Sequence, residues 1–301
     1  MSARRGRIDY HARMARVLAH VHEHLDAPLD LARLAELAHM SPFHWHRTYA
    51  ALYGETIAAT VRRLRLQRAT GHLANSALPV ADIARRCGYP NVQSFARAFR
   101  EGYGCSPSAY RRQGAHQLFR AGTAPVLAAG YTVEVREVAV VHLAGLDHHG
   151  SYMHVGQAFE ASFAHLSAAR LMRPDTRWLA VYFDDPDAVP EGQLHARAGL
   201  SLPQHIAAPA SLTRFALGGQ PCAVLRHRGP YATMRAAYAW LYGRWLVESG
   251  HAAADLPVFE EYLNNPRDTP PEALLTDIFL PLAAPAPQEE PGSAIAIGPG
   301  H

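Results

Sequence analysis

The sequence predicts a multidomain chain: an all-α N-terminal domain with two helix-turn-helix units, then an α+β domain of two pseudo-symmetric repeats with antiparallel sheets and one helix each. Two internal repeats carry this prediction. A helix-turn-helix pattern recurs about 50 residues after its first appearance. Further on, "LRHRGPYATMRAAYAWL" from Leu225 matches "LDHHGSYMHVGQAFEASF" from Leu146 at an offset of 79. A chain of 301 residues is long enough for two or three domains.

The charge of the chain is divided between its two halves. Residues 1–120 contain 18 Arg and 8 acidic residues, a net charge of +10, whereas residues 121–301 contain 11 Arg and 18 acidic residues, a net charge of −7. This asymmetry indicates that the first half meets a polyanion. Because no signal peptide or apolar run of about 20 residues is present, we expect a cytoplasmic protein with no membrane partner. The three scattered cysteines favour reduced thiols.

The first helix-turn-helix unit is expected after an amphipathic helix over residues 9–25. Asp30 is the expected N-cap of a helix over "LARLAELAHM", and Ser41-Pro42 is expected to start the next helix, with Ser as N-cap. The second unit begins with "VADIARRCGY", and Asn91 takes the place of Ser41. One long helix, "ETIAATVRRLRLQRATGHLA", joins the units, with arginines available to phosphates at positions Arg62, Arg63, Arg65 and Arg68.

Helical spacing separates a packing face from an outward face in the second helix of each unit. In the first unit Trp45 and Tyr49 pack, which leaves Phe43, His46 and Arg47 outward. In the second unit the outward residues are Gln93, Arg97 and Arg100. Arg binds guanine and Gln binds adenine in a bidentate manner, so both faces suit a DNA major groove. The alternative is an ordinary solvated helix face.

Residues 9–113 resemble the DNA-binding domain of the AraC-type transcriptional regulators. The resemblance rests on "SPFHWHRTYAALYGET", "IARRCGYPNVQSFARAFREGYGCSPSAYRR" and the closing Pro107-x-x-Tyr110-Arg111. It implies double-stranded DNA as a partner, and RNA polymerase is a further candidate partner. The base-reading positions that it implies are Phe43, His46, Arg47, Val92, Gln93 and Arg97.

The second half of the chain is expected to form two α+β copies. Expected strands cover residues 131–138, 138–146, 177–184 and 195–202 in the first copy, and about 211–217, 221–228, 257–264 and 274–281 in the second. One helix is expected in each copy, over 153–170 and 231–248. The expected domains are therefore 1–112 and 131–282, with a linker over 113–130 and a disordered tail over 283–301.

Positions that differ between the two copies are candidates for function, because structure alone explains those that match. Glu260 corresponds to Ala180, Trp240 to Ala161, and Trp245 to Leu166. Strand alternation places Glu260 on the same face as Tyr262. In a groove between the copies, such a carboxylate would pair with an organic cation, or hydrogen-bond a neutral ligand if burial raises its pKa. The alternative is a strand glutamate exposed to water.

Residues 131–282 resemble the GyrI-like small-molecule-binding domain. "CAVLRHRGPY", "WLYGRWL" and "FEEYLNNPRDTPPEALLTDIFLPL" carry the resemblance. It implies that a lipophilic or cationic effector binds in a pocket with Glu260. The aromatic neighbours implied for that pocket are Tyr182, Tyr231, Trp240 and Tyr262, and Trp245 is added from the comparison of the copies.

Two other functions fit the same residues. Some GyrI-like domains hydrolyse reactive electrophiles with a pocket Glu and a Tyr, and Glu260 with Tyr262 could form that pair. The chain could also be a DNA-binding protein without a ligand. We expect no cofactor and no metal, because the histidines at 148, 149 and 154 have no acidic or Cys partner at ligand spacing.

Overall fold

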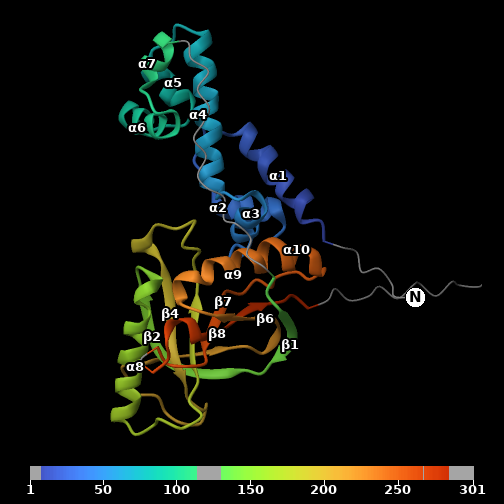
Figure 1. The fold of residues 1–301 in the computed structure, drawn as a ribbon, viewed down its shortest axis with the longest axis vertical. Helices are drawn as coiled ribbons and strands as arrows, with labels where there is room; N and C mark the ends of the chain where they lie inside the picture. The colour runs from blue at the N-terminus through green and yellow to red at the C-terminus, as the bar shows by residue number, and fades with distance from the viewer. Residues whose placement is uncertain (1–7, 114–129, 267, 285–301) are drawn as a thin grey trace, which may run out of the picture.

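The computed structural model describes residues 8–113, 130–266 and 268–284. An all-helical part is followed by an α+β part, and the two are in contact (Figure 1). The helices of the first part are α1 (Tyr10–Glu23), α2 (Leu31–Ala38), α3 (Trp45–Tyr53), α4 (Ile57–Asn75), α5 (Val80–Arg86), α6 (Val92–Tyr103) and α7 (Pro107–Gln113). Most of the predicted linker and most of the predicted tail lie outside the described residues.

The two helix-turn-helix units are α2–α3 and α5–α6, and α4 joins them as predicted. Asp30 caps α2 by accepting from the Arg33 amide at 3.1 Å, and Asn91 caps α6 by accepting from the Ser94 amide at 2.8 Å. Ser41 was the wrong choice as N-cap of α3. That helix begins at Trp45, after a turn in which the amides of His44 and Trp45 donate to the Ser41 carbonyl.

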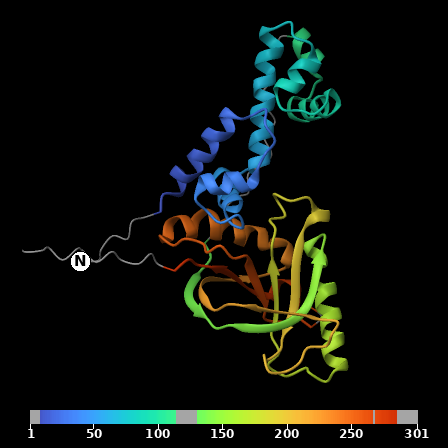
Figure 2. The same ribbon diagram turned by 180° about the vertical axis from the view of Figure 1, so that it is seen from behind.

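Each unit has its own apolar core, and α4 contributes to both. Ile57 and Val61 pack with the first unit, while Leu66, Ala69 and Leu73 pack with the second. Figure 1 and the reverse view in Figure 2 show the second unit at the far end of α4, away from the α+β part.

Arg65 of α4 fastens the two units to each other and is not available to a phosphate, contrary to expectation. Its guanidinium donates to the carbonyls of Leu25, Ala27 and Gly88. Gly88 has a φ of 74°, and a Cβ there would lie 2.8 Å from the Arg65 guanidinium carbon. Arg65 therefore acts as a brace within the N-terminal part.

The α+β part is built on one eight-stranded antiparallel sheet with strand order β1-β6-β8-β7-β3-β4-β2-β5. The strands of the first copy are β1 (Val133–Val138), β2 (Val141–His149), β3 (Trp178–Tyr182) and β4 (His195–Ser201); those of the second are β5 (Thr213–Leu217), β6 (Gln220–Arg228), β7 (Val258–Tyr262) and β8 (Leu275–Pro281). The copies exchange their first strands, since β1 pairs with β6 and β5 pairs with β2. All eight predicted strands are present.

The copies meet at the pairing of β3 with β7, in the middle of the sheet. Trp178 lies opposite Tyr262, Ala180 opposite Glu260, and Tyr182 opposite Val258. Because Ala180 and Glu260 are also equivalent in the repeat, the pseudo-two-fold axis passes between these two residues.

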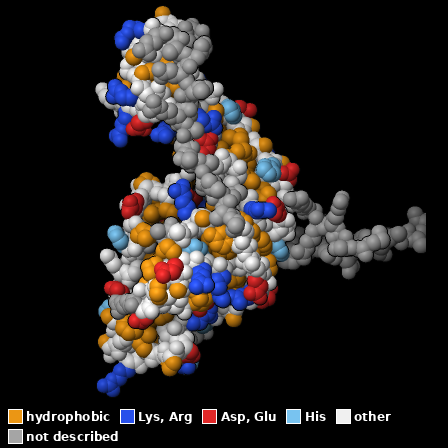
Figure 3. Space-filling view, viewed as in Figure 1, with side chains coloured by type: hydrophobic (Ala, Val, Ile, Leu, Met, Phe, Trp, Pro, Cys, Tyr) orange, Lys and Arg blue, Asp and Glu red, His pale blue; other side chains and the backbone are white. Residues whose placement is uncertain are grey.

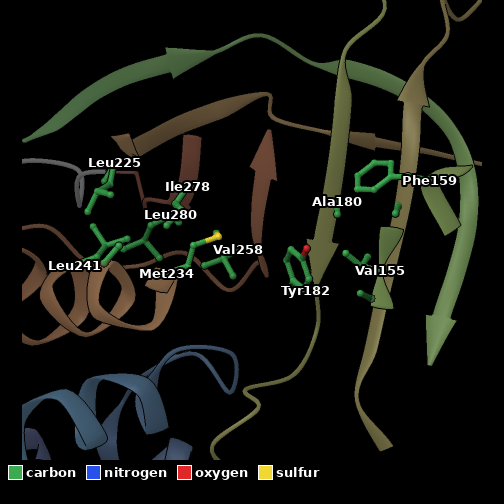
Figure 4. Close-up of a cluster of buried hydrophobic side chains, with 14 of the residues drawn as sticks. Val155, Phe159, Ala180, Tyr182, Leu225, Met234, Leu241, Val258, Ile278 and Leu280 are labelled. Carbon is green, nitrogen blue, oxygen red and sulfur yellow. The ribbon is translucent and has the colours of Figure 1, made fainter. Parts of the chain in front are cut away.

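Two helical segments cover one face of the sheet. The first copy contributes the short η1 (Tyr152–His154) and α8 (Gly156–Ala168); the second contributes η3 (Tyr231–Thr233), α9 (Met234–Trp240), the π-helical turn η4 (Leu241–Trp245) and α10 (Leu246–Ser249). Short turns η2 (Glu191–Gln193) and η5 (Pro271–Ala273) precede β4 and β8. Figure 4 shows Leu241 of η4 directed toward Leu225, Ile278 and Leu280 of the sheet. No helix in the described part of the chain is long and apolar enough to cross a membrane.

Candidate functional site

Glu260 is buried in the middle of β7, with only 5% of its surface exposed. The hydroxyls of Tyr238 and Tyr262 each donate to its carboxylate at 2.6 Å. The hydroxyl oxygens of Tyr262 and Tyr182 are 2.5 Å apart, which extends the network to β3. Burial raises the pKa of Glu260, and the three phenols oppose this by hydrogen bonding to the carboxylate. The solvent-exposed alternative for Glu260 is therefore wrong.

The network combines positions that obey the pseudo-symmetry with two that break it. Tyr182 is repeated as Tyr262, whereas Phe159 becomes Tyr238 and Ala180 becomes Glu260. The two groups that only the second copy carries hydrogen-bond to each other. We missed Tyr238 in the sequence, although its exchange for Phe159 adds one hydroxyl at an otherwise matched position.

These residues line a cavity of about 1080 Å³. Of the predicted pocket residues, the cavity includes Glu260, Tyr182, Tyr231 and Tyr262. It also includes aromatic residues that we had not predicted: Tyr152, Phe159, Phe163, Trp178, Tyr238 and Tyr242.

Trp240 and Trp245 do not line this cavity, so their assignment to it was wrong. The Trp240 ring contacts Tyr131 with ring centroids 5.8 Å apart, and Trp245 stacks on His251 at 5.8 Å. Helical geometry explains the error, because Met234, Tyr238 and Tyr242 share the face turned to the cavity. Position 240 falls on another face. Trp245, three residues after Tyr242, would share the cavity face in a regular α-helix, but residues 241–245 form the π-helical turn η4, which rotates Trp245 off that face. A difference between copies does not reveal which face a residue occupies.

The charge of the cavity wall is mainly negative. Seven carboxylates and three arginines line it. Arg177 forms a bidentate pair with Glu261 at 2.6 Å, and Arg235 lies 3.0 Å from Asp187. Two of the three arginines are thus already paired with a carboxylate, while Glu260 is held by phenol hydroxyls. A positively charged, aromatic ligand is the chemical complement of this wall.

The outward face of the second helix-turn-helix unit is open to solvent. Gln93, Arg97 and Arg100 are exposed along α6, and Val92 is partly buried at its start. The Arg97 side chain is 85% exposed and pairs with Glu101 at 3.1 Å. Figure 3 shows arginine side chains around this end of the molecule. The arrangement has the exposure that base contacts require.

The corresponding face of the first unit is covered by the α+β part, contrary to the expectation of an exposed face. The Arg47 guanidinium lies over the rings of Tyr238 and Tyr242, with centroid distances of 5.1 and 5.7 Å, and donates to the Asp184 carbonyl at 3.0 Å. His46 is 12% exposed and lies 3.2 Å from the Asp185 carboxylate. Phe43 is partly buried.

Hydrogen bonds and close packing hold this contact together. His44 is fully buried between the parts; its Nδ1 lies 2.8 Å from the Tyr242 hydroxyl and its Nε2 2.8 Å from the Leu256 carbonyl oxygen. The Ser41 hydroxyl donates to Asp255 at 2.8 Å. Gly243 lies against α3 so closely that a Cβ there would be 2.7 Å from that of Ala51.

Comparison with known proteins connects both parts of this geometry to described families. The model of the GyrI-like small molecule binding domain matches residues 131–283, which is half of the chain, and a helix-turn-helix domain model of AraC type matches residues 34–113. The chain belongs to the GyrI-like family. It joins this domain to an AraC-type helix-turn-helix domain, as the two resemblances in the sequence implied.

Individual relatives match about a third of this chain. The transcriptional regulator Rob of Salmonella typhimurium is 35% identical over 107 residues, which cover 36% of each chain. The regulatory protein SoxS of Escherichia coli is 31% identical over 97 residues, covering 32% of this chain and 91% of SoxS. The chain thus spans about a third of the length of Rob. Among solved structures, the C-terminal domain of EcmrR is 14% identical with a TM-score of 0.44, covering 51% of this chain and 98% of that one.

Proposed function

We propose that the protein is a DNA-binding transcriptional regulator of the cytoplasm whose GyrI-like domain binds a lipophilic organic cation. The observation that carries the proposal is a buried carboxylate, Glu260, inside an aromatic cavity of a chain that also has a helix-turn-helix domain with an exposed basic face. RNA polymerase is the further partner that such a regulator would meet.

The DNA side of the proposal rests on the two reading faces. Residues 93, 97 and 100 are exposed and residue 92 is partly buried, which supports their assignment to DNA contact, and residues 43, 46 and 47 would join them once the first face is uncovered. Arginine contacts to phosphates release counterions, so binding should weaken steeply with salt. Contacts from Arg97 to base edges should instead distinguish one DNA sequence from another.

The preference for a cation follows from the electrostatics of the cavity. Burial makes an ionised Glu260 costly, and a cation beside it offsets that cost more fully than hydroxyl donors do. Tyr182, Tyr231 and Tyr262 present ring surfaces on which a flat cation can stack. A neutral ligand would gain the apolar contacts but would leave the charge of Glu260 unpaired.

Titration with rhodamine 6G, a flat lipophilic cation, tests this side of the proposal. Glu260→Gln keeps the shape of the side chain and removes its charge, so the affinity should fall by about 1.5–3 kcal/mol, the value of a charge-assisted contact. Gln retains an oxygen acceptor for one tyrosine, so the melting temperature without ligand should change little.

Two controls make the titration specific. Asp175→Asn removes a carboxylate from the rim of the same cavity, where the side chain is 73% exposed, and should leave the affinity nearly unchanged because water screens that charge. Fluorescein, an anionic dye with the same ring system, should bind far more weakly than rhodamine 6G. Equal rhodamine affinity of Glu260→Gln and the original protein would rule out Glu260 as the ligand-binding charge.

Hydrolysis of a reactive electrophile is the second candidate function. It is favoured by the 2.6 Å hydrogen bond between Tyr262 and Glu260 within the cavity, an arrangement suited to a general base. An excess of a test electrophile such as an epoxide separates the two functions. Catalytic consumption that Glu260→Gln abolishes would establish the hydrolase, whereas stoichiometric binding without turnover fits the regulator.

A further inference from the structure

The cavity already contains a cationic side chain that belongs to the DNA-binding domain. Arg47, from the reading face of α3, is one of the cavity-lining residues. It lies over Tyr238, the same tyrosine that donates to Glu260 at 2.6 Å. Arg47 is therefore separated from the buried carboxylate by a single aromatic residue, and it uses the aromatic surface that a ligand cation would use.

The contacts of Arg47 in this position are incomplete. One terminal nitrogen, Nη2, donates to the Asp184 carbonyl, but Nη1 is buried and has no hydrogen-bond partner among the described residues. A buried donor without a partner carries a desolvation cost. In the contact between α3 and the α+β part, here called the closed contact, Arg47 thus keeps one buried donor without a partner in the described part of the chain. A competing cation would face the same aromatic and acidic surroundings without this cost.

The position of Arg47 also determines what the first unit can do. A major groove is about 12 Å wide and accepts little more than one helix. The reading face of α3 packs on η4, where Gly243 is in close contact with Ala51. The same side chains cannot contact base edges and the cavity at once, so the first unit reads DNA only after α3 has left the α+β part.

We propose that Arg47 is a built-in occupant of the effector site and that a cationic effector and Arg47 exclude each other. Binding of the effector would then release α3, so effector and DNA bind cooperatively. The proposal rests on the proposed function and adds to it the regulation of the site. It makes Arg47 a residue with two alternative partners: the aromatic cavity, and the bases of a major groove.

Thermodynamic linkage gives this proposal a quantitative form. If rhodamine 6G increases the DNA affinity by some factor, DNA must increase the rhodamine affinity by the same factor. Couplings of this kind are commonly about 5- to 150-fold. Only open molecules, in which α3 has left the α+β part, can bind the effector or bind DNA through the first unit. Each apparent affinity is therefore reduced in proportion to the fraction of open molecules. A variant that increases this fraction should increase both affinities.

The experiment measures all four affinities of this cycle with the full chain. The DNA is a duplex selected from random sequence in the presence of rhodamine 6G, so that both units can be engaged. We expect each ligand to strengthen binding of the other by the same factor, of about tenfold. Hydrogen exchange should show faster exchange over residues 45–53 when rhodamine 6G is added, because α3 loses its cover.

Two variants open the contact in different ways. Arg47→Ala removes the internal cation, so it should bind rhodamine 6G about tenfold more tightly, and the coupling factor should fall toward one. Gly243→Ala changes no cavity-lining residue but forces a clash with Ala51 of α3, whose carbonyl oxygen would lie 2.9 Å from the new Cβ. It should strengthen binding of both rhodamine 6G and DNA. Arg97→Ala is the matched control, because it weakens DNA binding yet should leave the coupling factor as it was.

The possible outcomes separate this inference from the proposed function. Failure of rhodamine 6G to bind, or equal binding by Glu260→Gln, would contradict the proposed function itself. Normal rhodamine binding that depends on Glu260, together with a coupling factor of one, would overturn only the inference. Weaker rhodamine binding by Arg47→Ala would also overturn it, since Arg47 would then be a ligand contact and not a competitor.

Discussion

The two helix-turn-helix units are built alike but present their reading faces to different surroundings. In the second unit the Arg97 side chain is 85% exposed at the far end of α4. In the first unit Arg47 lies over two tyrosine rings of the α+β part, and its neighbour His46 is only 12% exposed. The helical pattern specifies which residues share a face. What covers that face depends on tertiary contacts.

Under the proposed function, this difference means that the units would engage DNA unequally. The face of the second unit is exposed in the closed protein, whereas that of the first is covered. A protein of this design would hold DNA through one unit and add the second only when α3 is free. The following predictions test that inequality, beginning with the largest expected effect.

Acid should open the contact over the first unit. Burial, together with the nearby charge of Arg47 and His46, lowers the pKa of His44 to about 3. Hydrogen bonds to the backbone of Leu256 and Ala254 act in the opposite direction and raise this pKa. Burial likewise lowers the pKa of His46 to about 4, although the negative charge of Asp185 acts to raise it. Both histidines are therefore neutral in the closed form and take up a proton more easily in the open form.

The sign of the pH effect follows from these shifts. The closed contact has its full stability above pH 6.5 and loses stability as the pH falls toward 3, because protons bind the open form. At pH 4.5 the protonation of His44 alone should lower the stability of the closed form by an amount on the order of 2–3 kcal/mol. Hydrogen exchange of residues 45–53 measures the opening. His44→Gln, which keeps a donor and an acceptor but does not ionise, should flatten the pH profile; an unchanged profile would exclude His44 as its source.

Single arginine substitutions should separate the two units on DNA. Without effector, Arg97→Ala should weaken binding by about 2 kcal/mol and relax specificity at one base pair, because an exposed bidentate contact to guanine is lost. Arg47→Ala should not weaken binding under the same conditions, since Arg47 is engaged elsewhere. Equal losses for both variants, measured by binding-site selection and titration, would show that both faces read DNA in the absence of effector.

Removing one hydroxyl from the contact between α3 and the α+β part should have the smallest effect on the stability of the closed form. Tyr242→Phe keeps the ring beneath Arg47 but takes away the partner of His44, at a cost of about 1 kcal/mol to the closed form. Hydrogen exchange over α3 should accelerate accordingly. Tyr238→Phe is the matched control, because its hydroxyl serves Glu260 and not His44. An equal effect of the two substitutions would contradict the assigned role of His44.

Local signals in the sequence predicted local structure well. Asp30 and Asn91 were identified as N-caps because their side-chain oxygens can accept from the amide three residues further on. Ser41 has the same local chemistry, yet its hydroxyl bonds Asp255, which lies 214 residues further along the chain. Strand alternation likewise predicted Glu260 and Tyr262 on one face of β7, because alternation is a property of the strand alone.

The rest of the site depends on how separate elements meet. The sequence holds no signal that α3 docks on η4, because the residues that make the contact, such as His44, Arg47 and Gly243, each have an ordinary role within their own domain. Tyr238 could have been found, since its hydroxyl is the difference between the copies. Trp240 and Trp245 were chosen by the same reasoning and point elsewhere. A difference between the copies shows which position has changed, but not toward which part of the structure the new side chain points.

The position of Glu260 beside the pseudo-two-fold axis has a consequence for how such a pocket can be encoded. In a symmetric homodimer of one copy, the residues facing each other across β3 and β7 would have to be identical. The dimer could then have two adjacent carboxylates, which repel each other, or two alanines, which bind no charge. Joining both copies in one chain removes this restriction. It allows a single negative charge at the centre of a nearly symmetric pocket, with the small, uncharged Ala180 opposite it.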